Sequence, residues 1–312
     1  MSFTAFVLNN QYKKLQQLGD RLSEIDKQVD WEKFRPIISQ GYHDGPQGGR
    51  PHTDDVLIAK SLILQSLYGL SDEQLEFQCN DRISFQKFLG LPESIPDFST
   101  IWDAKERLST IGFGDAIWDE LQLQLKQRGF TVSKGVMQDA TIQEAKRPTG
   151  ETPRQGRDRD GGYMVKANKT QYGYKLHTKV CRDYNLIREI ATTSASVHDS
   201  RINLVRENDV AAWRDKGYAG TPLPNGVLDY TMAKGYRGKP LTIEQKRRNY
   251  GLSKIRSQVE RPFHVIKNCF DNSLICVTTC ARVHMRNIFT AIAYNLFQMV
   301  TLARSGLAIA IP

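Results

Sequence analysis

The feature that most constrains the fold is a short apolar run at residues 135–142 that carries a carboxylate, Asp139, near its centre. A run of this length, beginning with a glycine, is typical of a buried β-strand. Burying an uncompensated carboxylate costs several kcal/mol, so Asp139 is expected to be paired or bound to a metal ion. A simpler alternative is an aspartate at the solvated end of the strand or beside a neighbouring lysine.

The first 130 residues are predicted to form an all-helical module. Apolar residues at helical spacing run through residues 11–40 and lead to a glycine-rich loop at residues 41–51, which we expect to be a hinge or a module boundary. Further helices are predicted through residues 102–108, with Asp97 or Ser99 as the N-cap, and at residues 113–127.

Two helices joined by a short turn are predicted inside this module. Residues 56–67 form an apolar helix that ends near Gly69, and Ser71 with Gln74 is a capping box that begins the next helix. A helix-turn-helix of this kind can dock on DNA, but the same pattern occurs in ordinary helical bundles. Both interpretations stay open.

The remainder of the chain is predicted to mix strands and helices. Residues 146–162 are rich in proline, glycine and basic residues and are interpreted as a long mobile loop. Helical spacing returns from Ile255, and the apolar stretch at residues 287–303 is too short to span a membrane, so we interpret it as a buried helix. The elements expected in between are strands at about residues 172–182, 187–195, 210–213 and 227–232, and a helix beginning at residues 198–200.

The balance of charge favours a polyanionic partner. The chain has 43 Lys and Arg residues against 34 Asp and Glu, a formal net charge of +9, which suits nucleic acid or an anionic membrane surface. The first residues lack the pattern of a signal peptide, and five cysteines without a paired arrangement suit a reducing compartment. We therefore expect a cytoplasmic protein.

Two further carboxylates occur where metal-dependent chemistry would need them. Asp215 follows the strand predicted at residues 210–213, and sites in α/β folds gather at the carboxyl ends of strands. Glu260 shares one helical stripe with Arg256 and Lys267, although Pro262 would kink a continuous helix there. Each carboxylate has a structural alternative, because an aspartate near a glycine often forms a turn and the helical stripe could be a surface ion-pair ladder.

Together, Asp139, Asp215 and Glu260 form a donor set that suits phosphodiester chemistry. Cutting and rejoining phosphodiesters requires an activated nucleophile and neutralisation of charge on the phosphate and the leaving oxygen, which two metal ions about 4 Å apart accomplish. Magnesium prefers hard oxygen ligands and keeps positions open for water and phosphate.

In combination, these segments resemble DDE transposases of the insertion-sequence-5 type, which are enzymes of bacterial mobile elements. In the helical part, the resemblance is carried by residues 67–76 (LYGLSDEQLE), 84–91 (SFQKFLGL) and 96–101 (PDFSTI). In the second part, it is carried by residues 138–141 (QDAT), 173–178 (GYKLHT), 196–200 (SVHDS), 215–218 (DKGY) and 259–263 (VERPF). The resemblance spans most of the chain.

The resemblance implies that Asp139, Asp215 and Glu260 are the catalytic and metal-binding carboxylates. The cations four residues before and seven residues after the glutamate also fall into register with the family signature. That signature has a tyrosine three residues before Arg256, where this chain has Ser253, so a role of that tyrosine in positioning DNA does not carry over.

The implied fold is an α/β catalytic domain of ribonuclease-H-like type, a mixed five-stranded sheet flanked by helices, over residues 131–312. An all-α module for DNA binding and dimerisation, residues 1–130, precedes it. The implied chain order is three strands, a helix and a fourth strand, with the first aspartate on the first strand and the second aspartate after the fourth. The glutamate lies on a helix that returns beside them.

The implied activity is that of a DNA transposase, a metal-dependent nuclease and polynucleotidyl transferase. Such an enzyme cleaves at the terminal inverted repeats of an insertion sequence and joins the 3′-hydroxyl ends to target DNA, using two Mg²⁺ ions that Mn²⁺ can replace. The implied partners are double-stranded DNA and further copies of the chain, a homodimer or a larger assembly, and no membrane. The implied location is the bacterial cytoplasm, in association with the nucleoid.

Contacts to DNA are expected from basic and polar residues around the carboxylates. Lys175 and His177 could face phosphate from a central strand, whereas residues 198–199 are interpreted as a helix-capping pair. Basic residues at 146–160 and 234–248 could also contact phosphates, although basic runs are usually solvated. The residues expected to bind DNA are Lys175, His177, Lys216, Arg247, Arg248, Arg256 and Lys267.

Two other functions fit part of these observations. A catalytically inactive DNA-binding regulator derived from a transposase would share the positive charge and the helical pair, but intact carboxylates argue against it. A zinc site is a further alternative, because Cys276, Cys280 and His284 recur every four residues along one possible helical face. Structural zinc sites usually take four ligands from separate turns, so a helical core stripe is the simpler explanation.

Overall fold

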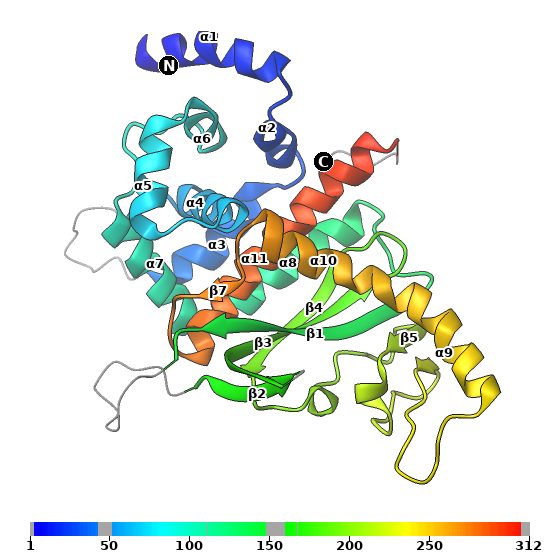
Figure 1. The fold of residues 1–312 in the computed structure, drawn as a ribbon. Helices are drawn as coiled ribbons and strands as arrows, with labels where there is room; N and C mark the ends of the chain where they lie inside the picture. The colour runs from blue at the N-terminus through cyan, green and yellow to red at the C-terminus, as the bar shows by residue number, and fades with distance from the viewer. Residues whose placement is uncertain (1–2, 43–51, 111, 148–159, 167, 307–312) are drawn as a thin grey trace. The chain divides into compact units, whose positions relative to one another are not determined.

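The structure, a computed structural model, describes residues 3–42, 52–110, 112–147, 160–166 and 168–306 (Figure 1). The chain divides into two compact units, Met1–Gly129 together with Ile288–Pro312, and Phe130–Asn287. We expected residues 131–312 to form the catalytic domain, whereas the chain from Ile288 onward packs with the helical unit.

The two long loops predicted from the sequence lie mostly outside the part of the chain that the structure describes. Residues 43–51 of the expected hinge and residues 148–159 of the expected mobile loop belong to the undescribed segments. The hypothesis that basic residues at 146–160 contact phosphate therefore concerns a segment of which only the ends are described. At one of those ends, the Arg147 guanidinium donates a hydrogen bond to the carbonyl oxygen of Thr170.

The helical unit packs short helices around aliphatic side chains such as Ile58 and Leu62, which are fully buried. The periodic stretch predicted at residues 11–40 is interrupted, because Gly19 adopts a positive φ of 87° and Asp20 caps a new helix. The described α-helices before the sheet are α1 (Phe3–Gln17), α2 (Arg21–Asp26), α3 (Arg35–Ile38), α4 (Asp55–Tyr68), α5 (Asp72–Asp81), α6 (Ile83–Phe88), α7 (Phe98–Thr110) and α8 (Phe113–Gln127).

The predicted helix-turn-helix is present as α4 and α5. Gly69 ends α4 in the left-handed region, and Ser71 and Gln74 form the expected reciprocal capping box. α4 is buried along most of its length, as a core helix would be. α5 contains the carboxylates Asp72, Glu73, Glu76 and Asp81 and no lysine or arginine, so it would repel phosphate. For this pair of helices, the charge favours the helical-bundle interpretation over insertion of α5 into DNA.

Removing the capping box is expected to weaken the helical unit modestly. The Ser71 hydroxyl accepts a hydrogen bond from the Gln74 amide at 3.2 Å, so Ser71→Ala leaves that amide without its cap and costs about 1 kcal/mol. Urea unfolding should show a lower midpoint with an unchanged slope. Ser99→Ala is the control, because the Ser99 hydroxyl bonds only to the Asp97 carboxylate at an exposed helix start. Equal midpoints for Ser71→Ala and the wild type would contradict the assignment.

The second unit is built on a mixed sheet of seven strands (Figure 1). The central strand β1 pairs antiparallel with β3 on one side and parallel with β5 on the other. β6 continues the sheet in parallel beyond β5, while β2 and β4 pair with successive parts of β3, and β7 pairs with the end of β1. The strands are β1 (Val136–Ala145), β2 (Gly162–Lys166), β3 (Lys169–Cys181), β4 (Ile187–Ser194), β5 (Ala211–Arg214), β6 (Leu228–Thr231) and β7 (Leu274–Ile275).

The predicted count of five strands is wrong, because the sheet contains seven strands and β2 and β7 are the two that lie off the expected width. β2 and β7 occupy the lengths of β3 and β1 that β4 and β5 leave unpaired, so the sheet has seven strands but is only five strands wide. Their few residues are paired by long-range contacts that leave no periodic pattern in the sequence. The close β1–β3 pairing needs Gly173, because a Cβ there would lie 2.1 Å from the carbonyl oxygen of Gln143.

The helix predicted to begin at residues 198–200 is only a three-residue 3₁₀-helix, η3 (Asp199–Arg201). The Gln138 side chain explains why it stops. Its amide nitrogen donates to Ile202 O at 2.6 Å and its oxygen accepts from Leu204 N at 3.2 Å, so the backbone beyond η3 is bound in an extended path. His198 caps η3 through Ser200 N, as the capping interpretation predicted.

The helices after the sheet begin earlier than the sequence pattern indicates. α9 (Ile243–Arg256) starts at a capping box of Thr242 and Gln245, before the helical spacing recognised from Ile255. α10 (Glu260–His264), a π-helical turn η6 (Val265–Cys269) and α11 (Cys280–Arg304) follow. The stretch at residues 287–303 lies in α11 and is buried almost throughout, as predicted. In the described ranges, no helix has both the length and the apolar character needed to cross a membrane.

Candidate active site

The sheet places Asp139 and Asp215 next to each other. β1 and β5 run parallel, with Val136 opposite Ala212 and Gln138 opposite Arg214. Asp139 is the next residue of β1 after Gln138, and Asp215 directly follows Arg214 at the end of β5. Asp215 then caps the 3₁₀-helix η4 (Lys216–Tyr218) by accepting a hydrogen bond from Gly217 N at 2.6 Å. The two carboxylates therefore meet at the carboxyl end of β5, the position expected for a site in an α/β fold.

Asp139 is held by two hydrogen bonds in a mostly buried position. One carboxylate oxygen accepts from the Ala140 amide at 2.9 Å and the other from Arg256 Nη1 at 2.6 Å, and the side chain is 18% exposed. Burial raises the pKa of Asp139 to about 6 against the opposing effect of Arg256, and the charges of Asp215 and Asp199 raise it further. A carboxylate surrounded by like charges in a desolvated position is suited to binding a cation.

Glu260 reaches the same region through Arg256. The Arg256 guanidinium donates to Asp139 from one nitrogen and to Glu260 Oε1 at 3.2 Å from another, so it bridges the two carboxylates. The proline anticipated as a helix kink is tolerated, because α9 ends at Arg256 and Pro262 falls in the first turn of the separate helix α10. Lys267, on η6, donates to the carbonyl oxygen of Ile142 on β1 at 2.6 Å and ties this segment to the central strand.

The donor set fits a hard divalent cation in chemistry, although the three side chains are not gathered as ligands. Across the described ranges, no group of three Asp, Glu, His or Cys side chains lies close enough together to hold a metal ion. The arginine between Asp139 and Glu260 accounts for this spacing, since its guanidinium neutralises both carboxylates. Magnesium takes one or two carboxylates together with water and phosphate oxygens, so these aspartates and the glutamate are the appropriate donors.

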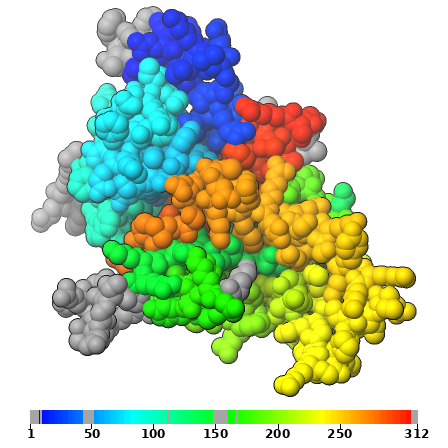
Figure 2. Space-filling model, viewed as in Figure 1, coloured from blue at the N-terminus to red at the C-terminus, as the bar shows by residue number. Residues whose placement is uncertain are grey.

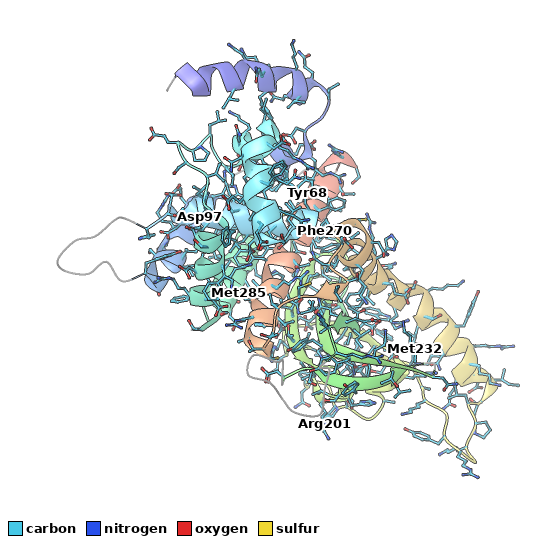
Figure 3. The ribbon with its side chains drawn as sticks, turned by 60° about the vertical axis from the view of Figure 1, so that its left-hand side comes forward. Tyr68, Asp97, Arg201, Met232, Phe270 and Met285 are labelled. Atoms are coloured by element: carbon cyan, nitrogen blue, oxygen red, sulfur yellow. The ribbon has the colours of Figure 1, made fainter. Side chains whose placement is uncertain are left out.

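A fourth carboxylate, which the sequence analysis assigned only to capping, lies beside the site. Asp199 accepts a hydrogen bond from Lys175 Nζ at 2.8 Å, and Lys175 also donates to Val197 O at 2.7 Å. η3, which contains Asp199 and ends at Arg201, contacts η4 next to Asp215; Figure 3 labels Arg201. The only sequence signal was its place in the segment SVHDS, which resembled a family block.

Buried residues beneath the site fix the strand ends. Arg214, which precedes Asp215, is fully buried and donates to Thr231 Oγ1 and to the carbonyl oxygen of Thr221, both at 2.9 Å. Tyr218 is also fully buried, and burial raises the pKa of its phenol. No local sequence pattern identified Arg214, because its partners come from the following loop and from β6.

Most residues expected to bind DNA are engaged inside the protein. Lys175, Arg256 and Lys267 are bound as described above, and Arg248 donates to the carbonyl oxygens of Thr231 and Asp229. His177 is buried with Nε2 at 2.9 Å from Thr193 Oγ1, and burial lowers its pKa to about 4, so it is neutral at physiological pH. The exposed members of the expected set are Lys216, Arg247 and Arg248, of which Arg248 makes the two hydrogen bonds given above.

The residues considered for zinc do not share a helical face. α11 begins at Cys280, so Cys276 lies before the helix, and the expected stripe of three is not formed. Cys280 and His284 instead contact Thr192 of β4: the thiol approaches its carbonyl oxygen at 3.6 Å and the imidazole approaches its hydroxyl at 3.1 Å. These contacts attach α11 to the sheet.

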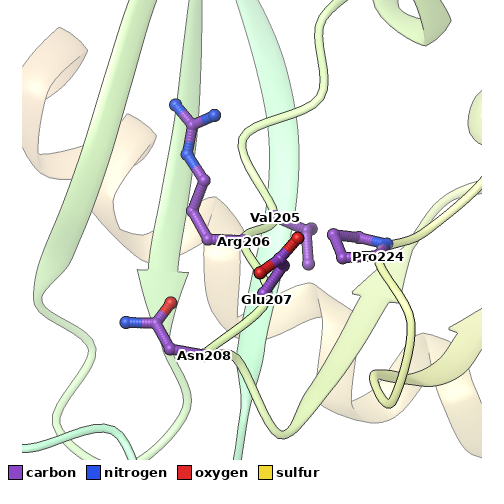
Figure 4. A pocket seen from close by; sticks show the side chains of 5 residues that line it. All are labelled: Val205, Arg206, Glu207, Asn208 and Pro224. Atoms are coloured by element: carbon purple, nitrogen blue, oxygen red, sulfur yellow. The ribbon is translucent and has the colours of Figure 1, made fainter.

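A separate hollow of about 540 Å³ lies between the loop that joins η3 to β5 and the loop that joins η4 to β6 (Figure 4). Its lining comprises Val205, Arg206, Glu207, Asn208 and Pro224. None of these five residues belongs to the carboxylate site or to the predicted catalytic set.

Three features define the class of protein. The central strand contains one aspartate, its parallel neighbour is followed by a second aspartate, and a later helix contains a glutamate. This arrangement is that of the ribonuclease-H-like, metal-dependent enzymes that the sequence resemblance implied. Residues 133–296 match the family model of the transposase DDE domain, and residues 10–107 match that of the transposase domain (DUF772). The chain belongs to the DDE transposases, metal-dependent polynucleotidyl transferases that act on DNA. A comparison with solved structures finds no match.

Proposed function

We propose that this chain is the transposase of an insertion sequence of the insertion-sequence-5 type. It cleaves DNA at the terminal inverted repeats of the element and joins the released 3′-hydroxyl ends to target DNA. The observation that carries this proposal is the pairing of β1 with β5, which sets Asp139 beside Asp215, while Arg256 links Asp139 to Glu260. These three carboxylates are the proposed catalytic and metal-binding residues.

The proposed site binds two divalent cations, Mg²⁺ with Mn²⁺ as a substitute, through Asp139, Asp215 and Glu260. When bound, the cations supply an activated nucleophile and neutralise charge on the phosphate and on the leaving oxygen. The cap that Asp215 forms on η4 holds its carboxylate at the end of β5. The Asp139 side chain is mostly buried, so little water surrounds it. Because charges interact more strongly where water is excluded, this burial strengthens the interaction of the carboxylate with a cation.

Arg256 is proposed to have two roles, as the counter-ion of the carboxylates and as a ligand of a DNA phosphate. Its guanidinium pairs with Asp139 and Glu260 and neutralises their charges. If the carboxylates held cations instead, the same planar donor group could form bidentate hydrogen bonds with a DNA phosphate. Lys216, which is exposed next to Asp215, is proposed to make a further phosphate contact.

The partners proposed for this activity are double-stranded DNA and a second copy of the chain. Two element ends must be brought together before joining, so a homodimer or a larger assembly is the proposed reacting form. The helical module at residues 1–130 is proposed to contribute DNA binding and dimerisation, through surfaces other than the acidic helix α5. The proposed location is the bacterial cytoplasm, with the nucleoid.

The direct test is cleavage of duplex DNA that carries the ends of the element. Purified full-length protein should nick or cut this DNA at the inverted repeats with Mg²⁺ or Mn²⁺, and chelation by EDTA should stop the reaction. Short inverted repeats in the DNA on both sides of the gene would supply the substrate sequence. Tight binding that is the same with and without divalent cation, with no nicked product, would contradict the proposal and identify an inactive DNA-binding regulator.

A further inference from the structure

Helix α9 presents a stripe of large and basic side chains on its outer side. Ile243, Arg247, Tyr250 and Lys254 are spaced by four, three and four residues, so they lie along one face of the helix. All four are exposed, with Ile243 at 71% and Tyr250 at 67%. α9 lies on the outside of its unit in the space-filling view (Figure 2).

The opposite face of α9 is fixed to the protein. Leu252 is buried, the Asn249 side chain exchanges two hydrogen bonds of 2.9 Å with the backbone of Ala233, and Arg248 binds the carbonyl oxygens at the end of β6. Met232, labelled in Figure 3, lies in the connection between β6 and α9, and its backbone amide donates a hydrogen bond to Arg214 O at 3.0 Å. Because these contacts hold the helix in one orientation, the outer stripe is a preformed surface.

The charge of α9 selects the kind of partner. The helix contains five lysines and arginines and a single carboxylate, Glu244. Within the stripe, Lys254 Nζ lies 4.6 Å from the centre of the Tyr250 ring, so the cation is held over the aromatic face. A rigid aromatic ring among cations, with one aliphatic side chain, suits a sugar-phosphate backbone better than a lipid surface, which requires a broad apolar face.

A similar tyrosine–lysine pair occurs in the connection that leads to α9. Tyr236 is 61% exposed, and Lys234 Nζ lies 5.9 Å from its ring centre. The turn is closed by backbone hydrogen bonds between Tyr236 and Lys239 in both directions, with Gly238 at a φ of 81°. The connection therefore repeats the chemistry of the stripe on a second ordered element.

The stripe lies on the helix that ends at the carboxylate site. α9 ends at Arg256, which binds Asp139, and begins at Ile243. At about 1.5 Å per residue, the helix leads roughly 20 Å away from the carboxylate site, which is the length of about six base pairs. A duplex whose phosphodiester reacts at the site would meet cations at intervals along this distance.

We propose that the outer stripe of α9 is a docking surface, through Arg247, Tyr250 and Lys254, for the double-stranded DNA that flanks the reacting phosphodiester. This inference rests on the proposed function, because it takes the carboxylate site as the point of reaction. Arg247 and Lys254 contact phosphates, and Tyr250 packs against the sugar-phosphate backbone. The contacts fix the direction in which the duplex leaves the site and carry no base specificity.

The test measures DNA binding by the full chain as a function of salt. In EDTA, fluorescence anisotropy with duplexes that carry the element end should give log K against log[salt] slopes reduced by about 0.9 in Arg247→Ala and in Lys254→Ala, and by about 2 in the double variant. Tyr250→Ala should weaken binding about tenfold or more with the slope unchanged, and Tyr250→Phe should retain most of the affinity. Lys134→Ala, at an exposed lysine before β1, is the matched control with an unchanged slope.

A second measurement uses duplex length. The affinity of the wild type should rise as the duplex is extended by about six base pairs past the reacting phosphodiester, and the double variant should gain little from this extension. Unchanged slopes in both single variants, or a preference of the stripe for single-stranded DNA, would overturn the inference. If the wild-type protein cuts DNA and the stripe variants bind DNA normally, only the docking surface is contradicted. If the wild-type protein cuts no DNA, the proposed function itself is contradicted.

Discussion

Asp139→Asn is expected to abolish metal-dependent DNA cleavage and to leave the protein folded. The amide has nearly the same shape as the carboxylate but lacks the charge that a divalent cation requires. A loss of about 4 kcal/mol of transition-state stabilisation lowers the single-turnover rate about 10³-fold. The measurement is cleavage of end-bearing duplex DNA in Mg²⁺, with Asp215→Asn and Glu260→Gln as parallel variants. A rate for Asp139→Asn close to that of the wild type would remove this residue from the catalytic set.

The folding of the same variant provides a readout that does not depend on activity. Mg²⁺ at about 100 times its dissociation constant stabilises a protein by about 2.7 kcal/mol, so the melting temperature of the wild type should rise with Mg²⁺ while that of Asp139→Asn should change little. In EDTA, the raised pKa of Asp139 means that its contribution to wild-type stability is present at acid pH and is lost as the pH rises through about 6. The stability of Asp139→Asn should not fall over this pH range. If the variant and the wild type had the same dependence of stability on pH, the burial of the Asp139 charge would be contradicted.

Lys179→Met is expected to cause the largest loss of stability. Lys179 is buried in the sheet, and its ammonium group lies 2.8 Å from a Glu189 oxygen and 3.1 Å from an Asp209 oxygen. The substitution leaves Asp209 buried without its cation, and breaking a buried ion pair in this way costs about 3–5 kcal/mol. Chemical denaturation should show this cost as a lower unfolding midpoint.

The matched control is a second cation in the same cluster. Arg206 pairs with Glu189 but its side chain is 60% exposed, so Arg206→Ala should cost at most about 1 kcal/mol. Adding Asp209→Asn to Lys179→Met should recover part of the stability, because it removes the buried charge that the first change leaves unpaired. A Lys179→Met protein as stable as the Arg206→Ala protein would show that the buried pair is not needed for stability.

Local sequence patterns predicted the parts of this structure that depend on neighbouring residues. The capping box at Ser71 and Gln74 and the helix end at Gly69 follow from backbone conformation and hydrogen bonding within one or two turns. The apolar run around Asp139 forms the predicted central strand, and the run before Asp215 forms the predicted short one. Such elements need no information about the rest of the chain.

The features that the sequence did not predict depend on contacts between distant segments. Arg256 was expected to contact DNA, but it binds Asp139, which lies more than a hundred positions earlier in the chain. Asp199 was interpreted only as part of a cap, and its proximity to the site results from the fold of the η3 loop against η4. The extended path after η3 depends on Gln138, whose side-chain hydrogen bonds replace those of a helix.

Helix α11 has a consequence for synthesis of the protein. Its residues from Ile288 onward belong to the helical unit, where Phe297 lies under the Arg21 guanidinium and Arg304 pairs with Glu24. This unit is therefore assembled from segments that lie before and after the sheet in the sequence, and its last buried side chains are translated only after the entire sheet. A chain that terminates before Ile288 would lack the buried α11 side chains of this unit, such as Ile292 and Leu296, and would expose the apolar side chains that pack against them. Incomplete copies of the chain are therefore expected to aggregate or to be degraded, because the core of their helical unit cannot close.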